Sequence, residues 1–154
     1  GWKTERKIIM KDQVYLAGPM EDCTEDHMTG WRTEAQLQLD FAGISSLDPT
    51  RRVSFHDQLG DNLQDVTKTM NICKRIFKQD LHDIANSRVV LADVRRDSGR
   101  GTGTSMELMF AHMKNKIIIL WANEGDFVHP FYEAMATEKH YTLEDAVEAV
   151  QEYY

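Results

Sequence analysis

The sequence predicts a doubly wound α/β domain, with a mostly parallel sheet of about five strands and helices on both faces. Segments 87–93 and 116–121 are continuous apolar runs of strand length, which is typical of parallel strands covered on both faces. Helical patterns alternate with the strand candidates along the chain. This alternation indicates strand–helix–strand units, whose crossover helices pack on a parallel sheet.

The first strand candidate covers residues 13–17, a short apolar run that Gly18 and Pro19 bring to an end. The acidic and polar stretch 21–29 then predicts a loop at the carboxyl end of this strand. The helix that follows has apolar residues at steps of three or four and a glycine at its C-cap position: Trp31, Ala35, Leu39, Ala42 and Gly43.

A second strand candidate at 44–47 ends in the turn-forming segment 48–52. Residues 55–62 are polar and irregular, so we expect no regular structure there. A long amphipathic helix follows, and its apolar positions again step by three or four: Val66, Met70, Cys73, Phe77, Leu81 and Ile84.

The second half of the chain repeats the pattern. Strand 87–93 leads into a charged, glycine-rich loop up to Gly103, and a helix follows that loop. Strand 116–121 has a polar exit loop. A final helix begins at Thr142, whose hydroxyl can cap it with Asp145 at the third position.

Composition narrows the class of protein. A chain of 154 residues fits one domain, with residues 1–12 as a flexible or tag-derived lead. The net charge of −7 argues against a nucleic-acid partner, and no apolar run is long enough to span a membrane. Cys23, Cys73 and the six histidines show no metal-site spacing. We therefore expect a cytoplasmic protein with reduced thiols and no bound metal.

Glu107 is the most unusual residue in the sequence, because it is the only charge between Ser105 and Ala111. Its apolar neighbours cover most of the helix circumference, which favours burial on more than one face. A buried carboxylate without a partner costs several kcal/mol. From the residues alone, three interpretations stay open: a favourable acid near a helix N-terminus, a side chain that reaches solvent, or a catalytic group.

Ligands of doubly wound domains bind beyond the carboxyl ends of the strands. Residues 15–20, Asp93 and Glu107 are all predicted to lie at this edge. The glycine run 101–106 is not a dinucleotide fingerprint, because it lacks the third glycine and follows the third strand instead of the first. A helix N-terminus after glycines can still hold one phosphate.

Several motifs, taken together, resemble one enzyme family. From residue 13 to residue 150 the chain is similar to the nucleoside 2-deoxyribosyltransferases, which are related to deoxynucleoside 5′-monophosphate N-hydrolases. The motifs that carry the resemblance are VYLAGP at 14–19, WR at 31–32, LDPTRR at 47–52, DLHDIANS at 80–87 and GTSMEL at 103–108, with NK at 115–116.

The resemblance implies a flavodoxin-like fold and transfer of a 2-deoxyribosyl group between nucleobases with net retention. It implies that Glu107 is the nucleophile at C1′, that Tyr15 orients it, and that Asp93 is the acid on the base side. It also implies a site without metal or organic cofactor, completed in a homodimer or larger homo-oligomer. The substrate-binding residues that we expect are Gly18, Pro19, Met20, Trp31, Arg51, Asp80, Asp97, Gly103, Thr104, Ser105, His129 and Phe131.

One position departs from the family pattern. Many members carry a sugar-binding aspartate six residues before the nucleophile, where this chain has Gly101. Asp97 is a candidate replacement for that aspartate. The related hydrolases have small polar groups for phosphate there, and the candidates here are Arg100, Thr102, Thr104 and Ser105. Hydrolysis of a nucleoside 5′-monophosphate is therefore the second hypothesis, and a catalytically idle nucleotide-binding subunit is the third.

Overall fold

The structure is a computed structural model that describes residues 13–20, 25–51, 66–99 and 101–154. Five strands form one sheet in the order β2-β1-β3-β4-β5, and every neighbouring pair is parallel. This is the flavodoxin-like order, so the predicted fold class is confirmed. The strands are β1 (Gln13–Ala17), β2 (Ser46–Leu47), β3 (Ser87–Asp93), β4 (Ile117–Trp121) and β5 (Glu138–His140).

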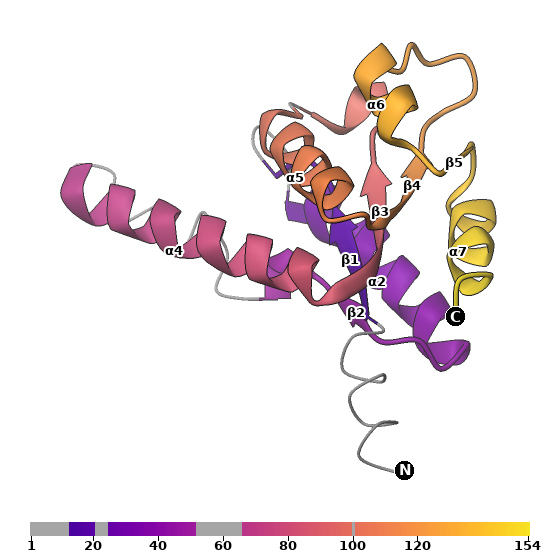
Figure 1. The fold of residues 1–154 in the computed structure, drawn as a ribbon, viewed down its shortest axis with the longest axis horizontal. Coiled ribbons are helices and arrows are strands. Elements are labelled where there is room, and N and C mark those ends of the chain that lie inside the picture. Colours follow the sequence, from indigo (N-terminus) through magenta and orange to yellow (C-terminus); the bar gives the residue numbers. More distant parts are fainter. Residues whose placement is uncertain (1–12, 21–24, 52–65, 100) are drawn as a thin grey trace.

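Helices cover both faces of the sheet (Figure 1). On one face, side chains of the sheet pack with α2 and α7 around Leu16, Leu91 and Ile119. On the other face they pack with α4 and α5 around Val90, Leu108 and Ile118. The helices are α2 (Glu25–Phe41), α4 (Val66–Ala85), α5 (Thr102–Met113), α6 (Pro130–Met135) and α7 (Leu143–Gln151), with 3₁₀ turns η1 (Pro49–Arg51) and η2 (Arg96–Ser98).

Local signals in the sequence account for the C-terminal end of α2 and the N-terminal end of α7. The backbone of Gly43 has a positive φ of 77° after α2, as a C-cap glycine requires. The hydroxyl of Thr142 accepts a hydrogen bond from the backbone N–H of Asp145 at the start of α7. Both predicted caps are confirmed.

Three local predictions were wrong. Residues 25–29 were expected in a loop but belong to α2, and Gly103 lies inside the first turn of α5. The predicted exit loop after β4 contains α6, because Pro130 occupies its first turn and the His129 ring accepts a hydrogen bond from the Phe131 N–H. Residues 21–24 and 55–62 lie outside the described residues.

The expectation that α5 is buried on more than one face is also wrong within this single chain. Met106, Met109 and Met113 are 60%, 49% and 70% exposed, because α4 and the sheet cover only the side that carries Leu108 and Ala111. The first part of α4 projects beyond the sheet (Figure 1), which leaves Met70 half exposed. In the described part of the chain, no helix is both long and apolar enough to cross a membrane.

Candidate active site

Tyr15 enters the site from the middle of β1. Because side chains alternate along a strand, Val14 and Leu16 face the α2 layer, whereas Tyr15 faces α4 and α5. The ring is fully buried, and no described residue forms a well-oriented hydrogen bond with its hydroxyl. Burial raises the pKa of Tyr15 well above its usual value, and the negative charges of Glu107 and Asp80 add to the rise.

Glu107 meets Tyr15 from α5. Its Oε2 atom is buried and has no hydrogen-bond partner among the described residues. Burial raises the pKa of Glu107 from 4.5 to about 8, the nearby Tyr15 hydroxyl opposes this rise, and Asp80 adds to it. The carboxyl group is therefore protonated in a large fraction of molecules near neutral pH, unless a ligand favours the charged form.

Asp80 completes a group that we call the Glu107 cluster, which consists of Tyr15, Asp80 and Glu107. It lies on α4 and is only 7% exposed. Its negative charge acts on both Tyr15 and Glu107. Thr104 lies one helical turn before Glu107, and its buried hydroxyl has no hydrogen-bond partner among the described residues. Strand β1 and helices α4 and α5 therefore bring together buried polar atoms whose hydrogen bonding is incomplete.

Asp93 does not join this cluster. Because side chains alternate along β3, Asp93 is on the same face as Val89 and Leu91, which is the face covered by α2 and α7. Its carboxylate accepts hydrogen bonds from Arg95 Nε at 2.9 Å and Nη2 at 3.0 Å, and from the buried Ser98 hydroxyl at 2.8 Å. The Arg95 guanidinium lies 3.8 Å from the centre of the Trp121 ring. The bidentate arginine and the Ser98 hydroxyl therefore already occupy both oxygens of the Asp93 carboxylate.

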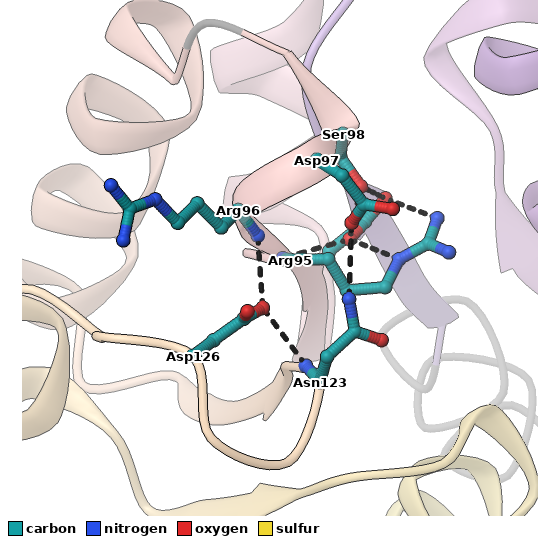
Figure 2. A network of polar contacts seen from close by, with 7 residues as sticks. Arg95, Arg96, Asp97, Ser98, Asn123 and Asp126 are labelled. Atoms are coloured by element: carbon teal, nitrogen blue, oxygen red, sulfur yellow. Dashed lines mark hydrogen bonds and ion pairs between the residues drawn. The ribbon is translucent and has the colours of Figure 1, made fainter.

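Asp97 lies in the same polar network, which Figure 2 shows between η2 and the loop after β4. Its carboxylate accepts a hydrogen bond from Asn123 Nδ2 at 3.0 Å. Asp126 accepts from the backbone N–H of Arg96 and of Asn123, which ties the two loops together. The geometry therefore gives Asp97 a hydrogen-bond partner in the loop network.

Three more predicted residues line a separate groove. Successive residues of an α-helix are about 100° apart, so Ser105 lies on nearly the opposite side of α5 from Glu107. Ser105, His129 and Phe131 border an apolar groove of about 640 Å³ between α5 and α6, together with Met109, His112, Tyr132, Ala134 and Met135. The Ser105 hydroxyl contacts the Tyr132 hydroxyl at 2.6 Å and donates to the Gly101 carbonyl at 2.8 Å.

The remaining predicted residues lie at the exit of β1 and nearby. A Cβ atom at Gly18 would lie 3.0 Å from the Trp31 ring and 3.2 Å from the Asp93 Cβ, so a larger residue here would have to displace one of these groups slightly. Trp31 packs on Trp121 with ring centroids 5.9 Å apart. Pro19 and Met20 follow Gly18, and Gly103 is in the first turn of α5. Arg51 is the last residue of η1, and only its backbone is described. Arg100 lies outside the described residues.

The site predicted from sequence omitted two residues. Arg32 was quoted only as part of the WR motif, yet it is fully buried and donates to the backbone carbonyls of Leu16 and Gly18. Tyr132 was not named, yet its hydroxyl lies 3.1 Å from the position of a Cβ on Gly101. A buried arginine cannot be distinguished from a surface one by residue type, and the position of Tyr132 depends on the unpredicted helix α6.

The chemistry available at the Glu107 cluster is that of two carboxyl groups and a phenol. In the described ranges, no group of three or more His, Cys, Asp and Glu side chains is arranged to hold a metal ion. A carboxylate that is poorly solvated can attack an electrophilic carbon, and a second carboxyl group can give a proton to the leaving group.

Neither the known protein-family models nor the curated proteins contain a match to this chain. Solved structures do show similar folds. The 2-deoxyribosyltransferase of Bacillus psychrosaccharolyticus is 18% identical and matches with a TM-score of 0.65 over 88% of this chain and 90% of that one. The CMP N-glycosidase of Clostridium botulinum is 13% identical, with a TM-score of 0.56 over 93% and 100%.

A third structure, the molybdenum cofactor binding protein of Rippkaea orientalis, is 15% identical and matches with a TM-score of 0.58 over 92% of this chain and 96% of that one. At these identities the comparisons show a shared fold, and one fold hosts several functions. The structural neighbours nevertheless include a 2-deoxyribosyltransferase and an N-glycosidase, the two kinds of enzyme that the sequence motifs resemble.

Proposed function

We propose that this protein transfers a 2-deoxyribosyl group between nucleobases, with Glu107 as the nucleophile. The observation that carries the proposal is the buried, unbonded Oε2 atom of Glu107 beside Tyr15 and Asp80. The Oε2 atom is shielded from solvent and has no hydrogen-bond partner among the described residues, so it is available to a cationic carbon. The fold shared with a 2-deoxyribosyltransferase supports the same activity.

The reaction has two steps. In the first, the ionised Glu107 attacks C1′, the electron pair of the N-glycosidic bond leaves with the base, and a glycosyl ester forms. In the second, a nitrogen of another base attacks C1′, the ester bond breaks and the Glu107 carboxylate is regenerated. Two displacements at the same carbon give net retention. Tyr15 is positioned to donate a hydrogen bond to the carboxylate once Glu107 is ionised.

For the proton that the leaving base needs, we propose Asp80 in place of Asp93. In the reactive state, the proton that Glu107 carries in the free protein resides on Asp80, so that Glu107 is ionised and Asp80 can donate. Asp80 shares the face of the sheet and the electrostatic environment of Glu107 and Tyr15. Asp93 is on the other face and is already held by Arg95 and Ser98. The acid that donates to the base then returns to its protonated form when the incoming base loses its proton.

Trapping of the glycosyl ester tests the proposal. The protein is exposed briefly to a 2-fluoro-2-deoxynucleoside, and its intact mass and the modified peptide are determined. We expect one adduct, on Glu107, and none in Glu107→Gln. Glu144→Gln, an exposed acid in the first turn of α7, is the matched control and should be labelled normally. An adduct on another residue, or none on the wild type across purine and pyrimidine probes, contradicts the proposal.

Hydrolysis of a nucleoside 5′-monophosphate is the second candidate, and the missing acid at Gly101 favours it. Asp97 accepts a hydrogen bond from Asn123 in the loop network, and we propose that it does not replace the missing acid. A phosphate therefore meets less negative charge at this end of the cluster. Release of base and deoxyribose 5-phosphate without an acceptor base would support hydrolysis, whereas equal rates with and without the 5′-phosphate would count against it.

The exposed methionines of α5 support the expected homo-oligomer. Met106, Met109 and Met113 give α5 an apolar side that a second copy can cover. Light scattering of the purified protein should then give a dimer or a larger assembly. A monomer at micromolar concentration contradicts this expectation and leaves the trapping experiment unaffected.

A further inference from the structure

We propose that Arg32 is a positioning residue for the Glu107 cluster, which fixes the exit of β1 and supplies the positive charge that a buried nucleophilic carboxylate requires. This inference rests on the proposed function and adds to it a residue to which none of the comparisons gives a role. It depends on three observations: the burial of Arg32, its contacts with the backbone and the set of charges around it.

Arg32 is a structural clamp on the end of β1. Its side chain is 0% exposed, Nε donates to the Leu16 carbonyl at 3.2 Å, and Nη2 donates to the Gly18 carbonyl at 2.9 Å. Strand β2 pairs with β1 only at Val14 and Tyr15. Beyond that point Arg32 provides donors to the β1 backbone, and its two bonds bracket the residues that directly follow Tyr15.

The charges around Glu107 are mostly negative. Asp80 and Asp83 approach it from α4 and raise its pKa, while Arg32 from α2 lowers it, as does the Tyr15 hydroxyl from β1. Burial lowers the pKa of Arg32 itself, and the nearby carboxylates of Asp48, Glu107 and Asp93 oppose this. An arginine keeps its charge under such conditions better than a lysine does, because its unperturbed pKa is higher and its charge is delocalised.

Asp48 sets how much of this positive charge reaches Glu107. Its Oδ1 atom is 3.8 Å from Arg32 Nε and accepts hydrogen bonds from the backbone N–H and the hydroxyl of Thr50. Asp48 therefore partly neutralises Arg32. Removing the positive charge and removing its neutralising partner should change Glu107 in opposite directions.

The test compares Arg32→Gln with Asp48→Asn, which should shift the pKa of Glu107 in opposite directions, and adds Arg32→Lys as a variant that keeps the charge. Arg32→Gln removes the charge and retains one donor, so the pKa of Glu107 should rise by about one unit. Asp48→Asn removes a negative charge and retains the Oδ1 acceptor, so the same pKa should fall by several tenths of a unit. Arg32→Lys keeps the charge but loses the planar fork, so the pKa should change little while turnover falls about tenfold.

The matched control is Arg88→Gln. Arg88 also donates to a backbone carbonyl, that of Tyr153 at 2.7 Å, and stacks on Tyr154. It lies near the first residue of β3, at the end of the strand opposite to Asp93. It should leave the pKa of Glu107 unchanged. The pKa is measured by carbon-13 NMR titration of glutamate-labelled protein, with Glu107→Gln to assign the resonance, and kcat/KM is measured against pH in parallel.

The outcomes separate the inference from the proposed function. Opposite shifts in Arg32→Gln and Asp48→Asn support a positioning role, because a structural defect alone would not reverse sign. Equal shifts, or no shift in both variants, overturn it. If Arg32→Gln does not fold, the sign of the shift in Asp48→Asn and the kcat loss in Arg32→Lys decide. NMR shifts in a protein that forms no glycosyl adduct would refute the proposed function alone.

Discussion

The Glu107 cluster differs from the polar network around Asp93 in how its polar atoms are bonded. We call the latter the Asp93 network; its members are Asp93, Arg95, Arg96, Asp97, Ser98, Asn123 and Asp126. The Asp93 carboxylate accepts from both the side chain and the backbone of Arg95 and from Ser98. In the Glu107 cluster, the Tyr15 hydroxyl and Glu107 Oε2 are buried without a hydrogen-bond partner among the described residues. Both regions contain a buried acid, Asp80 in one and Asp93 in the other, but only in the Asp93 network do the oxygen atoms named above have hydrogen-bond partners.

This difference separates a structural role from a functional one. In folded proteins nearly all buried polar groups are hydrogen-bonded. A cluster whose buried polar atoms lack such bonds is therefore a place where a ligand can supply the missing partners. The Asp93 network instead uses its bonds to hold η2 and the loop after β4 together. Asp93 and Glu107 are both acids at strand or helix positions typical of active sites, and the bonding pattern, not the residue type, distinguishes them.

The largest expected effect is the contrast between Asp80→Asn and Asp93→Asn. Asp80→Asn removes the proposed proton donor, so kcat should fall about 10²–10⁴-fold, the usual contribution of general acid catalysis. Asp93→Asn should lower the free energy of unfolding by about 2 kcal/mol, because Arg95 loses its charged partner, and should change kcat by less than about tenfold. Steady-state kinetics and urea unfolding on both variants measure the contrast.

The reverse pattern would return the acid role to Asp93. If Asp93→Asn abolished turnover while its stability stayed at the wild-type value, Arg95 would have to release the carboxylate during the reaction. A leaving group that needs no protonation, such as 4-nitrophenol, provides an internal check. With a 4-nitrophenyl 2-deoxyriboside, only the variant of the true acid should recover most of its rate.

The next expected effect is a dependence of stability on pH. The folded-state pKa of Glu107 is about 8, above its usual value of 4.5, so between these values the unfolded chain binds fewer protons than the folded one. The free energy of unfolding should therefore fall as pH rises through this range, in total on the order of 5 kcal/mol. This contribution is present in full below about pH 4.5 and is lost above about pH 8.

Glu107→Gln should remove this decline, because glutamine does not ionise. Urea unfolding of wild type and variant at a series of pH values tests the expectation, and Glu144→Gln should behave like the wild type. Two parallel curves for wild type and Glu107→Gln would show that Glu107 is more hydrated in solution than in the structure. The contrast between an unsatisfied and a satisfied region would then no longer hold.

A smaller effect is expected from Tyr15→Phe. The hydroxyl has no hydrogen-bond partner among the described residues, so its removal should leave the free energy of unfolding unchanged or raise it. Turnover should fall about 10–100-fold, because the ionised nucleophile loses a donor worth about 1.5–3 kcal/mol. Ser98→Ala is the counterpart in the Asp93 network and should lose stability and keep activity. A Tyr15→Phe variant that loses stability instead would indicate a structural hydroxyl.

The sequence was sufficient for the fold because its signals were local. Continuous apolar runs marked β3 and β4, and Gly43 and Thr142 marked helix ends. Helix α6 and the three-residue strand β5 escaped prediction because they are short and follow a polar loop. Where α2 begins was also missed, since acidic residues at a helix N-terminus resemble a loop.

The site was predicted less completely, for a physical reason. Glu107 and Tyr15 stood out as polar residues in apolar surroundings, and the structure places them together. The sequence could not assign Asp93 to the other face, because a carboxylate at a strand end serves either face until its partners are known. Nor could it separate Ser105 from Glu107, although the helical repeat alone places them on nearly opposite sides of α5.

The smallest expected effect concerns the boundary between the cluster and the groove, where Tyr132 reaches across to Gly101. Tyr132→Phe should cost about 1 kcal/mol, because the Ser105 hydroxyl loses its 2.6 Å partner. Gly101→Asp restores the acid of the family pattern, but its Cβ would lie 3.1 Å from the Tyr132 hydroxyl. The double variant should therefore be more stable than the sum of the two single changes predicts, which a double-mutant cycle measures. Since the added carboxylate repels a phosphate, the double variant should also favour nucleosides over their 5′-monophosphates more than Tyr132→Phe does. If the two changes are additive in stability and leave this preference unaltered, Tyr132 does not occupy the place of the missing acid.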